Sequence, residues 1–296
     1  MIAAPLPGRF AALILAGLGL FTLATASAEE RLNFKTAEGD TIEAIYYPPP
    51  TDAPKPSPAI IMLHGCGGLF TKSGKISSRE KSWIALFQKA GWAVLLPDSF
   101  GSRGYGSLCQ TRDRPVKPEK QRIYDTLGAL ELLHRNPDID AERIALAGWS
   151  NGAMAGLHAL RDGSPAAPPK GTKDFRTAVV FYPGCIALKK SHPDYRPRVP
   201  TLIQIGALDD WTLAKPCQAL VEDVTRRGDS PPMYIDAYPD AYHGFDHPSS
   251  KLKTIITKHS GYSSGQREVH VGSNPEAREK AIIRTMDWLR THLSER

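Results

Sequence analysis

The sequence lacks several signatures that would point to a particular class of protein. Its four cysteines form no C-x-x-C pair and join no histidine at metal-ligand spacing, so we expect no metal site. No internal repeat is present. Basic residues are scattered, the net charge of +6 is modest for 296 residues, and no basic motif interleaved with aromatics is present. This pattern is typical of solvated surface and argues against a nucleic-acid partner.

A long apolar run is missing as well. After Arg9 comes the stretch FAALILAGLGLFTLATASA, which is short and contains Gly, Thr and Ser, whereas a membrane span needs about 20 strongly apolar residues. A positive flank, this apolar stretch and the small residues Ala26-Ser27-Ala28 are typical of a secretory signal peptide cut after Ala28. No cysteine lies at the cut site, which argues against a lipoprotein. The sequence therefore predicts a signal peptide over residues 1–28, export to the periplasm or the medium, and no stable membrane anchor after cleavage.

Export changes the interpretation of the cysteines. An even number of cysteines in an oxidising compartment favours disulfide bonds. Cys185 follows one predicted strand and Cys217 follows the loop after the next, so these two could approach one another. Cys66 and Cys109 would then form the other pair. The alternative is four reduced, partly buried thiols.

The sequence does contain a regular alternation of predicted strands and helices. RLNFKT and TIEAIYYP predict an opening antiparallel hairpin. Continuous apolar runs predict buried strands, and helical periodicity predicts helices, as follows: strands at 59–65, 92–98, 143–148, 177–183, 201–206 and 233–239; helices at 79–90, 119–135, 151–160, 213–228 and 275–293. Residues 246–274 are expected to form a long loop. The alternation predicts an α/β protein with a mainly parallel sheet, helices on both faces and one domain over residues 29–296.

Binding and catalytic sites in such a sheet form beyond the carboxyl ends of the strands. Gly148-Trp149-Ser150-Asn151-Gly152 fits G-x-S-x-G between a predicted strand and a helix. The tight turn forces strained backbone angles on Ser150, so its neighbours must lack side chains. The N–H groups that begin the helix favour a developing negative charge there. Ser150 is therefore the predicted nucleophile; the alternative is that the glycines serve packing and Ser150 caps the helix.

A serine hydroxyl needs a base to take its proton. In this architecture an acid and then a histidine follow the serine, on loops after later strands. His243 follows the last predicted strand, and Asp209 and Asp210 follow an earlier one. We prefer Asp209 because G-x-x-D is the usual spacing from the last glycine of its strand. Its role would be to fix the imidazole tautomer and stabilise the imidazolium.

The oxyanion of the reaction needs two hydrogen-bond donors. One should be the amide of Asn151, the residue after the nucleophile. The other should come from the loop LHGCGGL after an earlier strand, where the amide of Cys66 is the best candidate and that of Gly67 the next. The alternative for this loop is a turn that serves chain reversal alone.

Together HGCGG, DSFGSRG, GWSNG, YPGC, IGALDDW and YPDAYHGFD resemble the dienelactone hydrolase family of α/β-hydrolases, over about residues 30–293. The resemblance implies an α/β-hydrolase fold without a large cap domain, and hydrolysis of an ester or lactone without a cofactor. It places the triad on Ser150, Asp209 and His243, with the amides of Cys66 and Asn151 as oxyanion donors. The chain departs from the family in one respect, because dienelactone hydrolases proper resemble G-x-C-x-G at this turn. Ser150 therefore favours a general serine esterase.

We expect a serine hydrolase that cleaves a small-molecule ester or lactone through an acyl-enzyme. A peptidase on the same fold and a non-catalytic binding protein on a hydrolase scaffold are the alternatives. The segment 246–274 and the aromatic residues Phe70, Trp149 and Trp211 are candidates for shaping the pocket, although such aromatics are more often core residues. Arg103 could pair with an acidic substrate or tether its own loop. Nothing in the sequence predicts the oligomeric state.

Overall fold

The structure is a computed structural model that describes residues 1–2, 29–260 and 263–294. The predicted signal peptide lies almost wholly outside these residues, and both its cleavage and the single-domain assignment stay predictions. A central sheet has the strand order β1-β2-β4-β3-β5-β6-β7-β8. Its strands are β1 (Glu30–Lys35), β2 (Thr41–Tyr47), β3 (Ser57–Leu63), β4 (Ala93–Pro97), β5 (Ile139–Trp149), β6 (Thr177–Phe181), β7 (Thr201–Gly206) and β8 (Met233–Tyr238).

The sheet is mainly parallel, as the alternation of strands and helices predicted. The antiparallel pair β1–β2 is the expected hairpin, and β2 also runs antiparallel to β4. From β4 to β8 every neighbouring pair is parallel. Every residue of β4, β6 and β7 is buried, which explains why these strands are mainly apolar, with Thr177, Thr201 and Gln204 as the polar exceptions.

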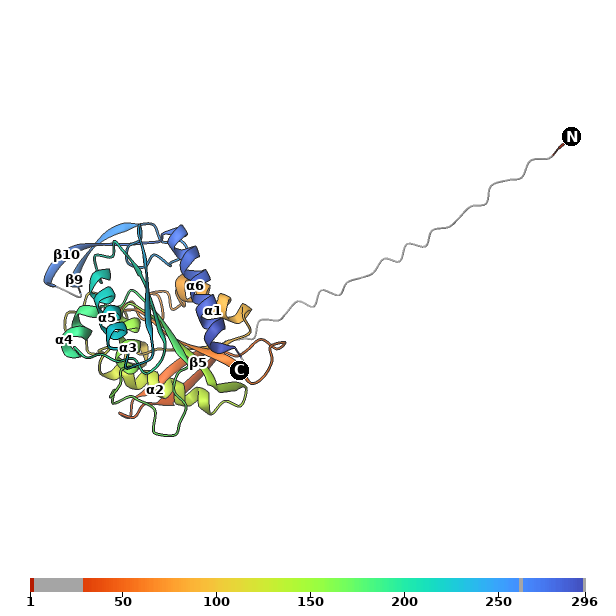
Figure 1. The fold of residues 1–296 in the computed structure, drawn as a ribbon, viewed down its shortest axis with the longest axis horizontal. Coiled ribbons are helices and arrows are strands. Elements are labelled where there is room, and N and C mark those ends of the chain that lie inside the picture. The colour runs from red at the N-terminus through yellow and green to blue at the C-terminus, as the bar shows by residue number, and fades with distance from the viewer. Residues whose placement is uncertain (3–28, 261–262, 295–296) are drawn as a thin grey trace.

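Helices cover both faces of the sheet (Figure 1). They are α1 (Ser78–Lys89), α2 (Gln121–His134), α3 (Asn151–Ala159), α4 (Cys185–Ser191), α5 (Ala214–Arg227) and α6 (Pro275–Leu293), with a short 3-10 helix η1 (Gly101–Arg103). Helices α1 and α6 share one face, where Arg278 of α6 donates to Ser82 of α1 over 2.5 Å. Helix α3 packs between α2 and α4 on the other face. The sequence did not predict α4, which spans only seven residues.

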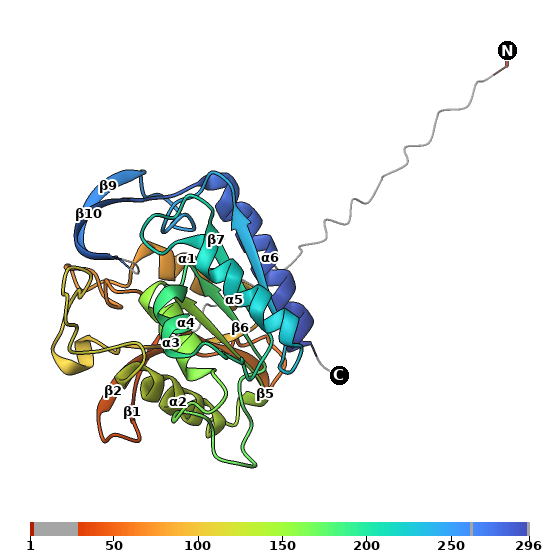
Figure 2. The ribbon, with the colours of Figure 1, turned by 60° about the vertical axis from the view of Figure 1, so that its left-hand side comes forward.

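The expectation of a loop over residues 246–274 is wrong in its central part. There β9 (Lys253–Ser260) and β10 (Ser263–Val271) pair antiparallel and form a two-stranded ribbon outside the main sheet. Figure 2 shows the ribbon arching away from the sheet. Among its described side chains only Thr257 and Val269 are buried. Because most of the others face solvent, the sequence carries little of the alternating apolar pattern by which a strand is predicted.

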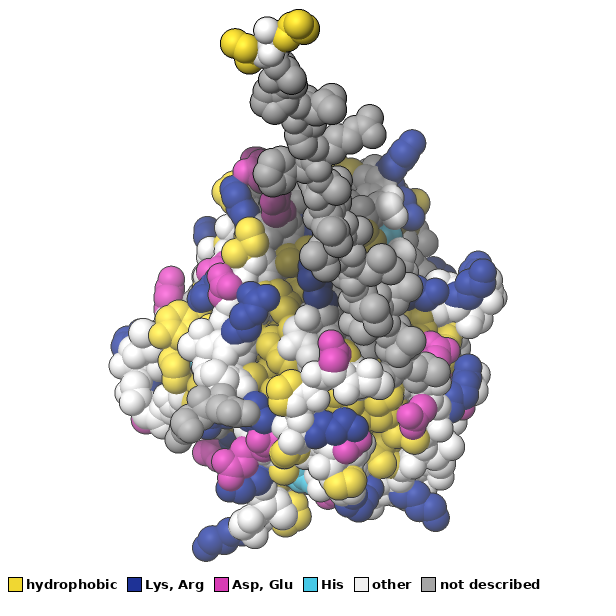
Figure 3. All heavy atoms as spheres, turned by 90° about the vertical axis from the view of Figure 1, so that its right-hand side faces the viewer, with side chains coloured by type: hydrophobic (Ala, Val, Ile, Leu, Met, Phe, Trp, Pro, Cys, Tyr) yellow, Lys and Arg dark blue, Asp and Glu magenta, His cyan; other side chains and the backbone are white. Residues whose placement is uncertain are grey.

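Both expected cysteine pairs are disulfide-bonded, Cys66 to Cys109 and Cys185 to Cys217. The two disulfides are consistent with an exported protein. On the face shown in Figure 3, Lys and Arg side chains are interspersed with Asp and Glu side chains. No helix in the described part of the chain is both long and apolar enough to cross a membrane.

Candidate active site

Ser150 occupies a sharp turn between β5 and α3. Its backbone has φ +51° and ψ −111°, a left-handed conformation that costs a residue with a side chain about 1–3 kcal/mol. A Cβ on Gly148 would lie 2.8 Å from the carbonyl oxygen of Gly152, and a Cβ on Gly152 would lie 2.1 Å from that of Leu63. The turn therefore requires both glycines of G-x-S-x-G, as the pattern predicted.

The three predicted triad residues meet at this turn. The Nε2 atom of His243 lies 3.1 Å from the Oγ atom of Ser150. The Nδ1 atom of the same ring lies 2.8 Å from Oδ2 of Asp209. Asp209 follows β7 and His243 follows β8, so the sheet brings their loops to the end of β5 that carries Ser150. Both side chains are buried, and this contact is shielded from water.

Backbone groups and one hydroxyl fix the Asp209 carboxylate. Its Oδ1 accepts from the amides of Trp211 at 2.9 Å and Thr212 at 2.8 Å. The hydroxyl of Thr212 lies 3.1 Å from Oδ2 of Asp209 and 3.1 Å from Nδ1 of His243. Sequence reasoning missed Thr212. The signal that could have found it is its position three residues after an acid at a strand end, where a turn folds back onto the carboxylate.

Two aromatic rings enclose the imidazole of His243. The ring of Tyr182 lies 4.4 Å from it and that of Trp211 lies 4.9 Å from it, centroid to centroid. Tyr182 has φ +41°, a second strained position beside Ser150. Its hydroxyl donates to Asp246 over 2.6 Å. Sequence reasoning missed Tyr182 as well, because only the fold brings the end of β6 next to the loop after β8.

Asp246 is a buried carboxylate beneath the site. Besides Tyr182, it accepts from the indole Nε1 of Trp83 at 2.8 Å and that of Trp149 at 2.7 Å. Three donors thus compensate for its burial. Trp149 is completely buried and lines neither of the two cavities beside Ser150 that are described below. This candidate pocket residue is therefore a core residue.

The two predicted oxyanion residues flank Ser150. Asn151 begins α3, and Cys66 lies in the glycine-rich loop after β3. This loop approaches the nucleophile closely, since a Cβ on Gly65 would lie 3.8 Å from Cβ of Ser150.

The side chain of Asn151 accepts from Arg122 over 2.6 Å. Arg122 is fully buried, and burial lowers the pKa of its guanidinium to about 10.

Two cavities open on either side of Ser150, and Cys66 and Trp211 line both. The first, about 360 Å³, is bordered by His243 and by the glycine-rich loop. Phe70 and parts of the 246–274 segment also line it, as proposed from the sequence. The second cavity, about 300 Å³, is lined by Asn151 and Met154 and by three basic residues, Arg112, Arg114 and Lys117.

Arg103 serves its own loop. It pairs with Asp40 at 2.6 Å and with the buried Asp125 at 2.8 Å. It lines neither cavity at Ser150, so the tethering interpretation is the one that the structure supports. Within residues 29–260 and 263–294, no cluster of three His, Cys, Asp or Glu side chains is arranged to hold a metal ion.

The sheet, its strand order and the strand-to-helix turn at Ser150 define an α/β-hydrolase fold. The sequence matches the dienelactone hydrolase family over residues 42–293. The chain belongs to this family, as the resemblance indicated, and the family points to hydrolysis of a small-molecule ester. No curated protein matches the sequence.

Solved structures with this fold resemble the chain over nearly their whole length. A dienelactone hydrolase from Anabaena variabilis has 17% identity and a TM-score of 0.58, over 91% of this chain and 100% of that one. A dienelactone hydrolase-like promiscuous phosphotriesterase from metagenomic libraries has 15% identity and a TM-score of 0.65, over 90% and 99%. Thermogutta terrifontis esterase 2 has 15% identity and a TM-score of 0.60, over 92% and 96%. At these identities the likeness concerns the fold.

Proposed function

We propose that the chain is a serine hydrolase that cleaves a carboxylic ester or lactone with Ser150, His243 and Asp209. The observation that carries this proposal is the pair of contacts made by His243, 3.1 Å to Ser150 and 2.8 Å to Asp209. A base in hydrogen-bond contact with both a hydroxyl and an orienting carboxylate is the arrangement that activates serine. Membership of a hydrolase family supports the same conclusion.

In the first half of the reaction, Oγ of Ser150 attacks the ester carbonyl while Nε2 of His243 takes the hydroxyl proton. Asp209 keeps the other ring nitrogen protonated and stabilises the imidazolium that forms. The carbonyl oxygen becomes an oxyanion, and the amides of Cys66 and Asn151 donate to it. The intermediate then collapses. Its C–O bond to the alcohol breaks, and the imidazolium returns its proton to the departing oxygen.

In the second half, water attacks the acyl group on Ser150. His243 takes a proton from this water, and the same two amides stabilise the second oxyanion. The acid then leaves, and Oγ of Ser150 recovers its proton. The imidazole thus ends the cycle neutral, and no cofactor takes part in any step.

The two cavities suggest where the halves of an ester bind. The leaving alcohol must lie within reach of Nε2 of His243, because this atom protonates it. Only the larger cavity is lined by His243, so the alcohol part belongs there. The acyl part then occupies the smaller cavity, beside Asn151 and Met154. In a lactone the two parts belong to one ring. After Ser150 opens this ring, the alcohol part stays joined to the acyl part until water releases the hydroxy acid.

The test compares wild type with Ser150→Ala on a short p-nitrophenyl ester, with a panel of lactones and peptide amides beside it. The variant should lose nearly all turnover while its folding, followed by circular dichroism, stays intact. A fluorophosphonate should label wild type at Ser150 and not the variant. The solved Thermogutta terrifontis esterase 2 is phosphoramylated by tabun, which makes an organophosphorus probe a reasonable choice. Unchanged turnover in a folded variant would refute the proposal, and turnover of amides alone would favour a peptidase.

We also propose that the protein is exported after cleavage behind Ala28. The predicted signal sequence and the two disulfides support this location. Mass spectrometry of the protein from a periplasmic or culture-medium fraction should give an N-terminus at Glu29. A chain that keeps its first residues and stays in the cell would contradict the proposal.

A further inference from the structure

The loop that contains Cys66 is rich in glycine, and its own anchor is His64, whose ring Nδ1 lies 2.8 Å from the carbonyl oxygen of Gly65. Three of its residues are glycines, Gly65, Gly67 and Gly68, and glycine is the residue with the greatest backbone freedom. The neighbouring segment around Cys109 supplies two anchors. The Cys66–Cys109 disulfide holds the side chain, and the amide of Leu108 donates to the carbonyl of Cys66 over 2.8 Å. Cys66 is therefore held on two sides from the same short segment.

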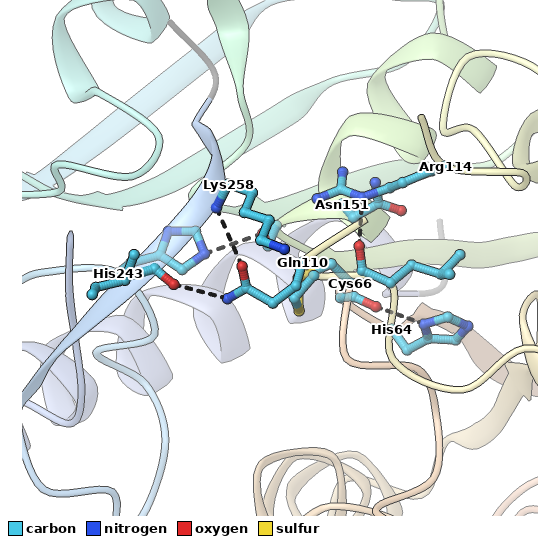
Figure 4. The surroundings of a disulfide bond; sticks show 12 residues. His64, Cys66, Gln110, Arg114, Asn151, His243 and Lys258 are labelled. Carbon is cyan, nitrogen blue, oxygen red and sulfur yellow. Dashed lines mark hydrogen bonds between the residues drawn. A yellow bond between two sulfur atoms is a disulfide. The ribbon is translucent and has the colours of Figure 1, made fainter. Parts of the chain in front are cut away.

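The next residue, Gln110, joins this segment to the ribbon. Its carboxamide nitrogen donates to the carbonyl of Ile256 over 3.1 Å, and its oxygen accepts from the amide of Lys258 over 3.2 Å. Both partners belong to β9. The side chain thus bonds the edge of β9 as a peptide group of an added strand would. Figure 4 shows Gln110 reaching from the disulfide towards Lys258.

The far strand of the ribbon is attached to the loops that carry the triad acid and base. Gly272, just after β10, donates its amide to the carbonyl of His243 over 3.0 Å. His270 bonds Asp210 through its backbone amide at 2.8 Å and its ring Nδ1 at 2.7 Å. A continuous series of bonds therefore runs from Cys66 through Cys109, Gln110 and the ribbon to His243. It borders the larger cavity, which is lined by residues from both ends of the series.

We propose that the Cys66–Cys109 disulfide and the Gln110 side chain form one positioning unit. It fixes the Cys66 amide at the oxyanion and holds the ribbon beside the alcohol cavity. Neither Cys109 nor Gln110 reacts with substrate, so both act through Cys66 and the ribbon. This inference rests on the proposed function, since it assigns a means of positioning to the same site.

The effect should appear in kcat more than in KM. An oxyanion donor binds charge that exists only in the transition state, so displacing it lowers kcat and leaves ground-state binding nearly unchanged. Complete loss of one donor lowers kcat by roughly 10²–10³-fold. A loosened amide should cost part of this, about tenfold or more. A disulfide that served stability alone would leave kcat of the folded enzyme unchanged.

The experiment compares two disulfide-free variants under conditions where both are folded. Cys66→Ser/Cys109→Ser removes the proposed unit. Cys185→Ser/Cys217→Ser is the control, because it breaks a disulfide of similar sequence separation, 32 residues against 43, that joins α4 to α5 and lines neither cavity. We expect kcat on a p-nitrophenyl ester to fall about tenfold or more in the first variant, with KM within about threefold. The control should keep kcat near that of wild type.

Gln110→Ala tests whether the two parts act together. Gln110 is exposed, so this variant should fold, and kcat should fall about fivefold as its two hydrogen bonds are lost. Added to Cys66→Ser/Cys109→Ser, the same change should lower kcat no further. Equal effects in both backgrounds, or wild-type kcat without the Cys66–Cys109 disulfide, would overturn the inference. Absence of Ser150-dependent turnover in wild type would instead refute the proposed function itself.

Discussion

Asp209 and Asp210 are adjacent in the sequence but bind different histidines. Oδ2 of Asp209 lies 2.8 Å from Nδ1 of His243, whereas Oδ2 of Asp210 lies 2.7 Å from Nδ1 of His270 in the ribbon. The first carboxylate is buried, and the second is partly exposed. One turn after β7 thus presents one acid to Ser150 through His243 and another to the base of the ribbon.

The neighbouring acids give a matched pair of variants. Asp209→Asn should lower kcat by roughly 10⁴-fold, because an amide no longer fixes the required tautomer of His243. Asp210→Asn should lower kcat less than about tenfold, because its oxygen still accepts from His270 and does not contact His243. Steady-state kinetics on one p-nitrophenyl ester distinguish them, with urea unfolding as the control for folding. Similar losses in both variants would contradict the assignment of Asp209 to His243.

The close packing at the Ser150 turn predicts that Gly152 is needed for a high free energy of unfolding. Gly152→Ala would place a Cβ 2.1 Å from the carbonyl oxygen of Leu63, a backbone atom, so the variant should lose about 3 kcal/mol of unfolding free energy. Gly67→Ala is the control, because its Cβ would meet no atom within 4 Å and should change stability by less than about 0.5 kcal/mol. Denaturant unfolding measures both values. A stable Gly152→Ala variant would show that α3 can shift away from β3.

The free energy of unfolding should decrease as the pH is lowered, because of His158. Burial, aided by the nearby His192 and Arg161, lowers the pKa of His158 to about 4 from 6.5. Above pH 6.5 the ring is neutral in both states and contributes nothing to pH dependence. Between pH 6.5 and 4 the unfolded chain takes up the proton and the folded protein does not, so about 3 kcal/mol of stability is lost on acidification.

His158→Gln isolates this contribution. Burial also lowers the pKa of His64, so wild type and variant should both lose stability in acid, and the difference between them is the quantity to measure. Urea unfolding at pH 7 and pH 4.5 should show a smaller loss in the variant. Identical losses would mean that His158 takes up its proton in the folded protein.

The two disulfides should contribute nearly equally to stability. The cysteines of the two disulfides are 43 and 32 residues apart in the sequence. From the entropy that a closed loop of this length removes from the unfolded chain, each disulfide should add about 4 kcal/mol to the free energy of unfolding. Urea unfolding of the two double serine variants should therefore give similar losses. If one loss exceeded the other by more than about 2 kcal/mol, native-state packing around that disulfide would have to account for the difference.

Local patterns accounted for much of the architecture. The buried strand β4 is continuously apolar, and α6 begins and ends at the residues that its periodicity predicted. The G-x-S-x-G turn could be predicted because any such turn brings backbone atoms so close that only glycine fits at these two positions. The ribbon and α4 were missed. The ribbon exposes most of its described side chains, α4 has only seven residues, and neither gives a strong apolar period.

The sequence by itself determined the sheet, its helices and the order in which a serine, an acid and a histidine follow its strands, because burial and backbone geometry leave periodic marks along the chain. Only the tertiary structure decided that Asp209 and not Asp210 contacts His243, that Tyr182 and Thr212 complete this contact, and that Gln110 joins the Cys66–Cys109 segment to the ribbon. These relations join residues from different loops. Their distances depend on how the strands pack side by side, and no local period records that packing.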